Sequence, residues 1–382
     1  MGLFDLLRKK KAQETVVENV SVEKDKSANV EVRIKAGMVA SHENDVIPAE
    51  QLMKTAYPSR NNGLYPHEIL VLDYADSFKT QDNQYQKFWW NRYGIKNVDA
   101  VLQDLLKRGF ISIAPITTTL EKCRVAEIKG VLDERGLNAK GKKALLIQSL
   151  LDGVSAEELN KIFPNKFYMR TPKGDAELKA EEYVPYIHCH SIEGLDIWSL
   201  NKLIYTSPSY LTYRDVIWQY LNQRSADHYK ANDFGLYRNC RYAMATFLSE
   251  EGKVDGKLDM LAEVVFFDLS GAGNNFNPEY LYIIAPYLFP YDKSQATTYP
   301  AIVKEIFECQ EKLGLTDETL RATLAQRMKK LSAPIELFEV EECVDIIFYE
   351  HANDKDSLNK IYKLAEERFH KKHPGLQKNP FL

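Results

Sequence analysis

The sequence of 382 residues is poor in cysteine and lacks any long apolar run. Its five cysteines are odd in number, scattered and without a CxxC pair, which favours reduced thiols in a cytoplasmic protein over a disulfide framework. No apolar run reaches the roughly 18 residues of a membrane span, and the apolar start is too short for a secretory signal. Positive charge is not in excess either, because the formal net charge is -4. Binding to nucleic acid would therefore need a local basic patch.

The composition predicts a folded chain, since 45% of the residues are hydrophobic and the length allows two or three domains. We expect a mainly α-helical fold. We also expect that the protein is not an enzyme and needs no cofactor. Five regions are expected: a disordered basic and polar tail at 1–60, a small winged-helix-like helical module at 61–116, a helix-extension-helix motif at 117–155, a wing-like hairpin or connector at 156–191, and an α-helical domain of antiparallel helical pairs at 192–382.

The first residues, "MGLFDLLRKKKAQ", allow two interpretations. Four apolar side chains followed by basic residues could form a short helix that docks on a partner or a membrane surface. The alternative is a frayed terminus, because two turns of helix are marginal on their own. Leu6 stands where a myristoylation signal has Ser or Thr.

The 61–116 module carries three helix signals and one strand signal. Pro66 suits the first turn of a helix, "NQYQKFWWNRYG" indicates an aromatic helix ending at Gly94, and Asn97 is a good N-cap for a helix ending at Gly109. "FISIA" predicts a short strand. The aromatic residues 88–93 could stack on bases, but the alternative is that they fill the core of a small module.

The stretch "VAEIKGVLDERGLNAKGKKALLIQSLL" predicts a helix, a short extension and a second helix. Val125, Ile128 and Leu132 have helical spacing, and Gly136 can take the left-handed conformation that ends a helix. A second helix then starts near Gly141. Its first backbone N–H groups have no partner within the helix and lie at the positive end of the helix dipole, which makes this a ready site for an anion.

Basic residues gather around this helix start. Between residues 121 and 143 there are seven basic and four acidic side chains, a local charge of +3 in a chain of net -4. Contacts with DNA phosphates are the expected result, with little reading of base sequence. The alternative is that Gly-Lys-Lys only starts a solvated helix and has no binding role. The residues we expect to contact DNA are Arg135, Gly136, Lys140, Gly141, Lys142 and Lys143.

The same stretch resembles a SAP motif, the small helix-extension-helix module that binds DNA. The similarity covers about 33 residues and includes the Gly-Leu pair, the Gly-Lys pair and the leucines of the second helix, here Gly136, Leu137, Gly141, Lys142, Leu146 and Leu150. The chain departs from the family pattern at Leu145, which hints at packing against a neighbour, and at Ser149, where a basic residue is common. Together with "YPHEILVLDYA" and "LLKRGF", the stretch is similar to SAP-bearing proteins of bacterial and prophage genomes, a group that implies no activity.

Two weaker patterns lie in the 156–191 region. "IHCH" would place His188 and His190 on one face of a strand, where they could share a metal with His228 and Cys240 as guessed further ligands, but ordinary strand histidines are the alternative and no metal site is predicted. "PKGDAELK" contains Asp175, Glu177 and Lys179, which resemble the D/E-x-K core of metal-dependent nucleases. A turn and helix start is the alternative.

Beyond residue 192 the apolar spacing is helical. The glycine-rich "SGAGNN" at 270–275 lacks the Lys-Ser/Thr of a phosphate-binding loop and indicates a turn. The helical segments expected are 209–223, 235–250, 256–269, 277–287, 300–313, 317–331, 336–351 and 355–371.

Three functional hypotheses remain from the sequence. The first is a non-enzymatic DNA-binding protein that holds duplex phosphates through the SAP-like motif and contacts another protein through its helical domain. The second is a metal-dependent nuclease built on Asp175, Glu177 and Lys179. The third is a protein-interaction or membrane-peripheral factor, although a membrane role is less expected than the others.

Overall fold

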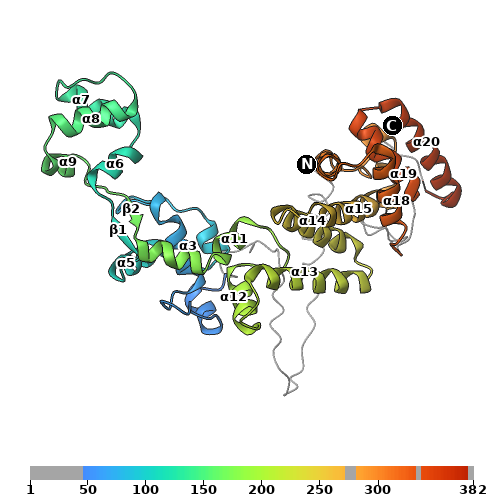
Figure 1. Cartoon of the computed structure of the whole chain (residues 1–382), viewed down its shortest axis with the longest axis horizontal. Coiled ribbons are helices and arrows are strands. Elements are labelled where there is room, and N and C mark those ends of the chain that lie inside the picture. Colours follow the sequence, from blue (N-terminus) through green and yellow to red (C-terminus); the bar gives the residue numbers. More distant parts are fainter. Residues whose placement is uncertain (1–45, 272–280, 333–336, 377–382) are drawn as a thin grey trace, which may run out of the picture. The chain divides into compact units, whose positions relative to one another are not determined.

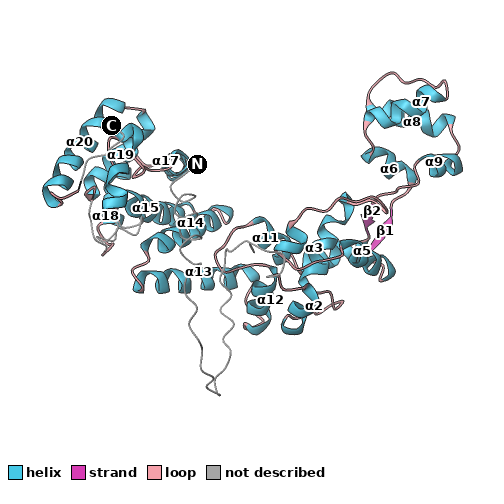
Figure 2. Ribbon diagram, turned by 180° about the vertical axis from the view of Figure 1, so that it is seen from behind, coloured by secondary structure: helices cyan, strands magenta, loops and turns pink. Residues whose placement is uncertain are grey.

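A computed structural model describes residues 46–271, 281–332 and 337–376. The chain divides into two units, Met1–Lys35 and Ala36–Leu382, and every described residue belongs to the second. The apolar start at 1–11 and most of the glycine-rich segment at 270–275 lie outside the described residues. The described part is mainly helical, as predicted, with two short strands (Figure 2). None of its helices is both long and apolar enough to cross a membrane.

A first hydrophobic core is built by the helices on either side of residues 114–167, together with α13 (Tyr213–Lys230) and the end of α14 (Phe234–Glu250). Pro66 stands at the start of α3, as predicted, and the Glu68 carboxylate accepts from the Tyr65 backbone N–H at 2.6 Å. Asn97 caps α5 by accepting from the Ala100 N–H at 2.9 Å. The helices are α2 (Ala49–Leu52), α3 (Pro66–Tyr74), α4 (Phe88–Asn91), α5 (Val98–Lys107), α10 (Pro172–Ala180), α11 (Tyr183–Cys189), α12 (Ile197–Thr206) and α13 (Tyr213–Lys230), with 3₁₀ turns at Met53–Thr55 and Ala75–Ser77.

The folded part begins earlier than the expected boundary at residue 60. Ala49 is buried, and its backbone N–H donates to the Gly94 carbonyl at 2.9 Å. Gly94 has a φ of +70°, and a Cβ at this position would lie 2.1 Å from the Ile47 carbonyl oxygen. The missing side chain of Gly94 therefore lets the 47–49 backbone dock, a contact between distant segments that local composition does not reveal.

The predicted strand "FISIA" is confirmed as β1 (Ile111–Ile113). It pairs antiparallel with β2 (Tyr168–Arg170), in the register Ile111 with Arg170. The two strands do not form a hairpin, because residues 114–167 lie between them. This segment leaves and returns at one place, and it builds its own hydrophobic core.

The region 156–191 is mainly helical, with β2 as its one described strand, rather than the wing-like hairpin we expected. Thr171 caps α10 by accepting from the Gly174 N–H at 3.2 Å, with Pro172 at the first helical position. "EYVPYIHCH" forms α11 and not a strand. Its buried residues are Tyr183, Val184 and Ile187, a helical i, i+1, i+4 pattern, and Pro185 lies in the first turn, where a helix tolerates proline.

A second hydrophobic core joins the helices that follow. The prediction for 300–313 matches α17 at both ends, because Pro300 starts the helix and Gly314 ends it with a φ of +64°. The short helix α12 is absent from the predicted set, and α13 extends seven residues past the predicted end at 223. The helices are α14 (Phe234–Glu250), α15 (Val254–Leu269), α16 (Leu281–Ile284), α17 (Pro300–Leu313), α18 (Asp317–Met328), α19 (Val340–Ala352) and α20 (Lys355–Lys372), with 3₁₀ turns at Ala285–Tyr287 and Tyr291–Lys293.

Candidate nucleic-acid interface

Residues 114–167 form a small helical module with a core of its own (Figure 1). Its helices are α6 (Ile116–Lys122), α7 (Val125–Glu134), α8 (Lys143–Gly153) and α9 (Ala156–Ile162). The hydrophobic core takes side chains from all four helices and from the turn after α8: Leu120, Ile128, Leu132, Leu146, Leu150, Val154 and Leu159. The helix-extension-helix predicted from the sequence is thus present as α7, residues 135–142 and α8, with α6 and α9 completing the core.

Two glycines position the extension: Gly136 at its start and Gly153 at the far end of α8. Gly136 has a φ of +66°, so it ends α7 in the left-handed region that glycine favours. Leu137 then turns inward and packs at the end of α8, where a Cβ on Gly153 would lie 2.6 Å from the Leu137 side chain. The sequence predicted the role of Gly136 but gave no sign of the notch at Gly153, which depends on a contact between the extension and the far end of α8.

The start of α8 is open. Gly141 has a φ of +115°, a conformation that L-residues rarely adopt, and it turns the chain into the helix. Lys142 occupies the N-cap position without a side-chain cap, whereas Ser155 caps α9. Among the described residues, no acceptor meets the backbone N–H groups of Lys143 and Ala144. These groups are therefore free to donate to an anion at the positive end of the helix dipole.

The four predicted basic residues differ in what they contact. Lys140 and Lys142 are exposed, and neither side chain meets a carboxylate within the described part of the chain. Lys143 is half-buried and donates from Nζ to the Glu121 carbonyl at the end of α6, at 2.5 Å. Arg135 is paired with Glu158 of α9 at 2.6 Å. Lys140 and Lys142 are thus the accessible charges. Lys143 links α8 to α6, and the charge of Arg135 is offset by Glu158.

Three further lysines, Lys79, Lys122 and Lys166, lie close to the ends of the module. Lys122 belongs to the basic residues counted between 121 and 143, whereas no sequence pattern indicated Lys79 or Lys166. Lys79 and Lys122 both stand over the Phe167 ring, at 5.4 and 5.3 Å from its centroid. Burial raises the pKa of the Cys123 thiol, while the charges of Lys79, Lys143 and Lys166 oppose that shift. Burial also lowers the pKa of Lys166. These lysines come from distant parts of the sequence, and two contacts explain their proximity: the bridge between Lys79 and Phe167 and the pairing of β1 with β2.

Leu145 and Ser149 are the positions where the module departs from the SAP pattern. Leu145 is 62% exposed and lies against the Gly141 turn, so within the described chain it does not pack against a neighbour as the sequence suggested. Ser149 is partly exposed on α8. The surface beside Lys142 therefore includes an apolar side chain as well as charge.

The aromatic cluster at 88–93 belongs to the first core. Trp89 and Tyr93 are buried, and α4 spans four residues rather than the longer helix predicted. Both ring nitrogens of His188 are hydrogen-bonded here, to the hydroxyls of Tyr74 at 2.8 Å and Tyr93 at 2.7 Å. The core interpretation of these aromatic residues is confirmed for Trp89 and Tyr93.

The two histidines of "IHCH" do not share a site. They flank the end of α11, where residues two apart point in different directions. His190 bonds to Glu250 at 2.8 Å and to the Tyr186 carbonyl at 2.6 Å, while His188 contacts the aromatic residues described above. A metal held jointly by His188 and His190 is therefore ruled out by their helical setting.

Asp175, Glu177 and Lys179 do not gather either. They lie on α10, and this places Asp175 and Lys179 on one side and Glu177 on the buried side, 1% exposed. Asp175 pairs with Arg170 at 2.9 Å, whereas Glu177 accepts from Ser59 and Asn62. The carboxylates serve the packing of α10 and do not converge on a common metal position.

Comparisons with known proteins add no further information on the site. No family model, no curated protein and no solved structure matches this chain.

Proposed function

We propose that the chain is a non-enzymatic DNA-binding protein that holds duplex phosphates through a SAP-like module at residues 114–167. The observation that carries the proposal is the open start of α8, where the N–H groups of Lys143 and Ala144 have no described acceptor and Lys140 and Lys142 are exposed beside them. Backbone N–H groups at a helix start and flexible lysines both suit phosphate oxygens.

The chemistry of this surface favours phosphates over base edges. Sequence reading in the major groove relies on planar, bidentate side chains such as Arg, Asn or Gln placed on a helix that enters the groove. Arg135, a predicted contact, is instead paired with Glu158. Lysines and backbone N–H groups remain, and they neutralise charge without discriminating bases. We therefore expect similar affinity for unrelated duplexes.

Charge contrast supports the same conclusion. The module holds nine basic and seven acidic residues, a local charge of +2, within a chain of net -4. The rest of the chain then carries -6 and is repelled by a polyanion, which orients the molecule so that the module approaches first. The expected contact of the helical region 192–382 with another protein stays a prediction, as does a cytoplasmic location.

The test is duplex binding by the full-length chain at low salt, measured by gel shift or fluorescence anisotropy. We expect the wild type to bind unrelated duplexes alike and Lys140→Ala/Lys142→Ala to bind at least about tenfold more weakly, since the double substitution removes two cations that meet phosphates. Lys161→Ala is the matched control, because Lys161 is an exposed lysine of the same module that pairs with Glu157. Equal binding by wild type and double variant would reject the proposal.

A further inference from the structure

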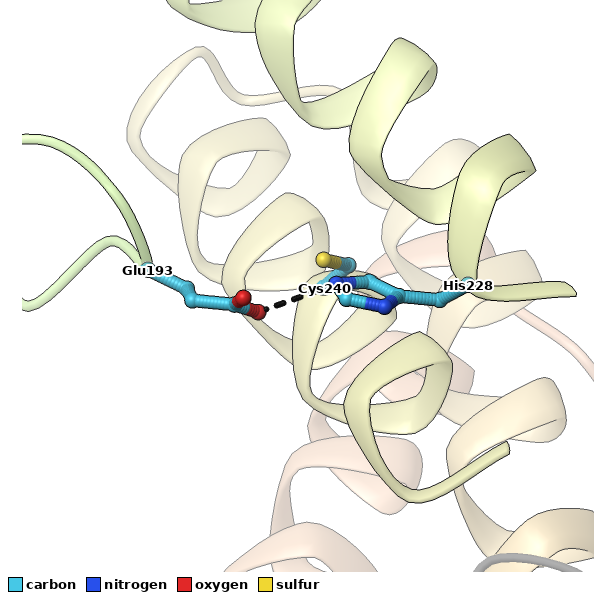
Figure 3. A group of neighbouring side chains, drawn as sticks. All are labelled: Glu193, His228 and Cys240. Carbon is cyan, nitrogen blue, oxygen red and sulfur yellow. Dashed lines mark hydrogen bonds and ion pairs between the residues drawn. The ribbon is translucent and has the colours of Figure 1, made fainter. Parts of the chain in front are cut away.

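Three potential metal ligands converge from segments that are far apart in the sequence. Glu193 lies in the loop between α11 and α12, His228 in the last turn of α13, and Cys240 in α14. Figure 3 shows their side chains pointing toward one another. One ligand atom from each residue lies within 4.8 Å of the others.

The spacing of these atoms suits a tetrahedral ion. Oε2 of Glu193 and Nε2 of His228 are 3.1 Å apart. Two such atoms bound to one zinc ion at about 2.0–2.1 Å would be about 3.3 Å apart, and a sulfur bound at about 2.3 Å would be about 3.5 Å from either. The present pair already has nearly this separation. The Cys240 sulfur lies within 4.8 Å of both partner atoms, so it has at most about 1.3 Å to close.

The surroundings place and support these ligands. His228 and Cys240 are 7% and 3% exposed, so they lie out of bulk water, whereas the Glu193 side chain is 28% exposed and leaves a path to solvent. Arg224 donates to the second oxygen of Glu193, Oε1, at 2.6 Å. This leaves Oε2 facing His228. A bound carboxylate is commonly held in this way by a neighbouring hydrogen bond.

The set of donor atoms indicates which metal would bind. A thiolate and an imidazole favour zinc over the hard cations calcium and magnesium, which prefer oxygen ligands. A simple ion pair between Glu193 and His228 would account for the 3.1 Å contact, but it would not need the Cys240 sulfur at the same point. The third donor is what distinguishes the cluster from a buried ion pair.

We propose that Glu193, His228 and Cys240 bind one zinc ion, with a solvent molecule as the fourth ligand. On binding, the Cys240 thiol loses its proton to water and its sulfur bonds to the metal, while neutral His228 binds through a ring nitrogen and Glu193 through Oε2. The ion joins the loop before α12 to the α13–α14 pair. The site is independent of the proposed DNA contact. It contains His228 and Cys240, which the sequence analysis considered as further ligands, but Glu193 takes the place of His188 and His190.

The experiment is a cobalt titration of the full-length chain after removal of bound metal by chelation. Cobalt in a site with one thiolate gives a near-ultraviolet sulfur-to-metal charge-transfer band and visible d–d bands. We expect one equivalent of cobalt to produce these bands in the wild type and zinc to displace it. Cys240→Ser should lose the charge-transfer band, whereas Cys309→Ser, a matched change at a buried cysteine of the second core, should keep it.

A second variant tests the site without replacing a ligand, in case Cys240→Ser does not fold. Arg224→Ala removes the side chain that holds Glu193 without removing a ligand, and it should weaken zinc binding about 10–100-fold while the helical circular dichroism is retained. A wild type that takes up no cobalt at micromolar concentration overturns the proposal. Loss of the band in Cys309→Ser to the same extent as in Cys240→Ser also overturns it.

Discussion

Lys142 and Lys143 are adjacent in sequence but have different roles in the structure. Lys142 is an exposed N-cap residue, while Lys143 donates to the Glu121 carbonyl and so ties the start of α8 to the end of α6. We expect Lys143→Ala to lower the free energy of unfolding by about 0.5–1.5 kcal/mol, since it removes one hydrogen bond.

Lys142→Ala should leave that free energy unchanged and reduce DNA affinity alone. Chemical denaturation together with anisotropy of a labelled duplex would measure both quantities for the two variants. Equal losses of stability in the two variants would contradict the distinct roles.

Two glycines of the module provide a matched pair of alanine substitutions. Gly130 lies inside α7, and no atom lies within 4 Å of the position that a Cβ would take there, so Gly130→Ala should raise the free energy of unfolding by about 0.5–1 kcal/mol. Gly141 has a φ of +115°, and a Cβ there would lie 3.0 Å from the Leu145 side chain. Gly141→Ala should therefore lower the free energy of unfolding by about 1–3 kcal/mol.

Thermal unfolding of the two variants would show shifts of opposite sign. The interpretation of Gly141 as a required turn would be wrong if Gly141→Ala unfolded at the wild-type temperature.

Glu181 makes stability depend on pH. Burial raises the pKa of its carboxyl to about 7, and Tyr205, which donates to Oε1 at 3.1 Å, only partly opposes this. The folded state holds this proton more tightly than the unfolded state does. The free-energy cost of burying the charged carboxylate is therefore absent below the unfolded pKa of about 4.5, and it is complete once the pH rises past the folded pKa of about 7. Glu181→Gln should thus stabilise the protein at pH 8, by roughly 3 kcal/mol at most, and change little at pH 4.5.

Urea denaturation at the two pH values would measure this difference. Glu182→Gln, at the exposed neighbouring position, is the control and should show no such pH dependence. A Glu181→Gln variant with the same gain at both pH values would contradict the account.

At the level of elements, the long helices were the most predictable feature. Helices α14, α15 and α17 fall close to their predicted ranges because each combines sustained apolar spacing with a clear signal at one or both ends. Short elements were less predictable. Helix α11 was expected as a strand, since seven residues with apolar and polar side chains fit both periods, and tertiary packing decided between them.

Contacts between distant elements could not be predicted at all. The sequence indicated the Gly136 and Gly141 turns, but not the bond from Lys143 to Glu121, the notch at Gly153 or the salt bridge of Arg135. Each of these depends on how helices of the module pack, and no local pattern encodes it. For the same reason, the sequence offered His228 and Cys240 only as conceivable metal ligands, and it did not indicate that Glu193 lies beside them.

The pairing of β1 with β2 predicts that the module can be removed. The Ala114 N–H donates to the Phe167 carbonyl at 2.9 Å, so the two ends of the segment already adjoin. Replacing residues 115–166 by a two-residue Asn-Gly turn should leave the rest of the chain folded, because the module has a separate core. The shortened chain should lose duplex binding.

Circular dichroism, cooperative thermal unfolding and anisotropy with a labelled duplex would test this prediction. A shortened chain that binds DNA as tightly as the wild type would place the interface elsewhere. A shortened chain that does not unfold cooperatively would show that the module supports the first core.

At the scale of the whole molecule, charge determines how DNA binding should respond to salt. A chain of net -4 gains affinity for DNA only where cations meet phosphates, and each such contact releases counterions. Binding by a small exposed cluster should give a modest slope of log affinity against log salt, about -2 to -4, in contrast to the steep slopes of strongly basic proteins.

The most direct test of the account is this salt slope, measured by anisotropy for the full-length wild type, Lys140→Ala/Lys142→Ala and the control Lys161→Ala. We predict that the double variant reduces the slope by about two, one for each lysine that no longer neutralises a phosphate, and that the control matches the wild type. A double variant with the wild-type slope, or a wild type whose binding does not respond to salt, would contradict the claim that the start of α8 holds DNA phosphates.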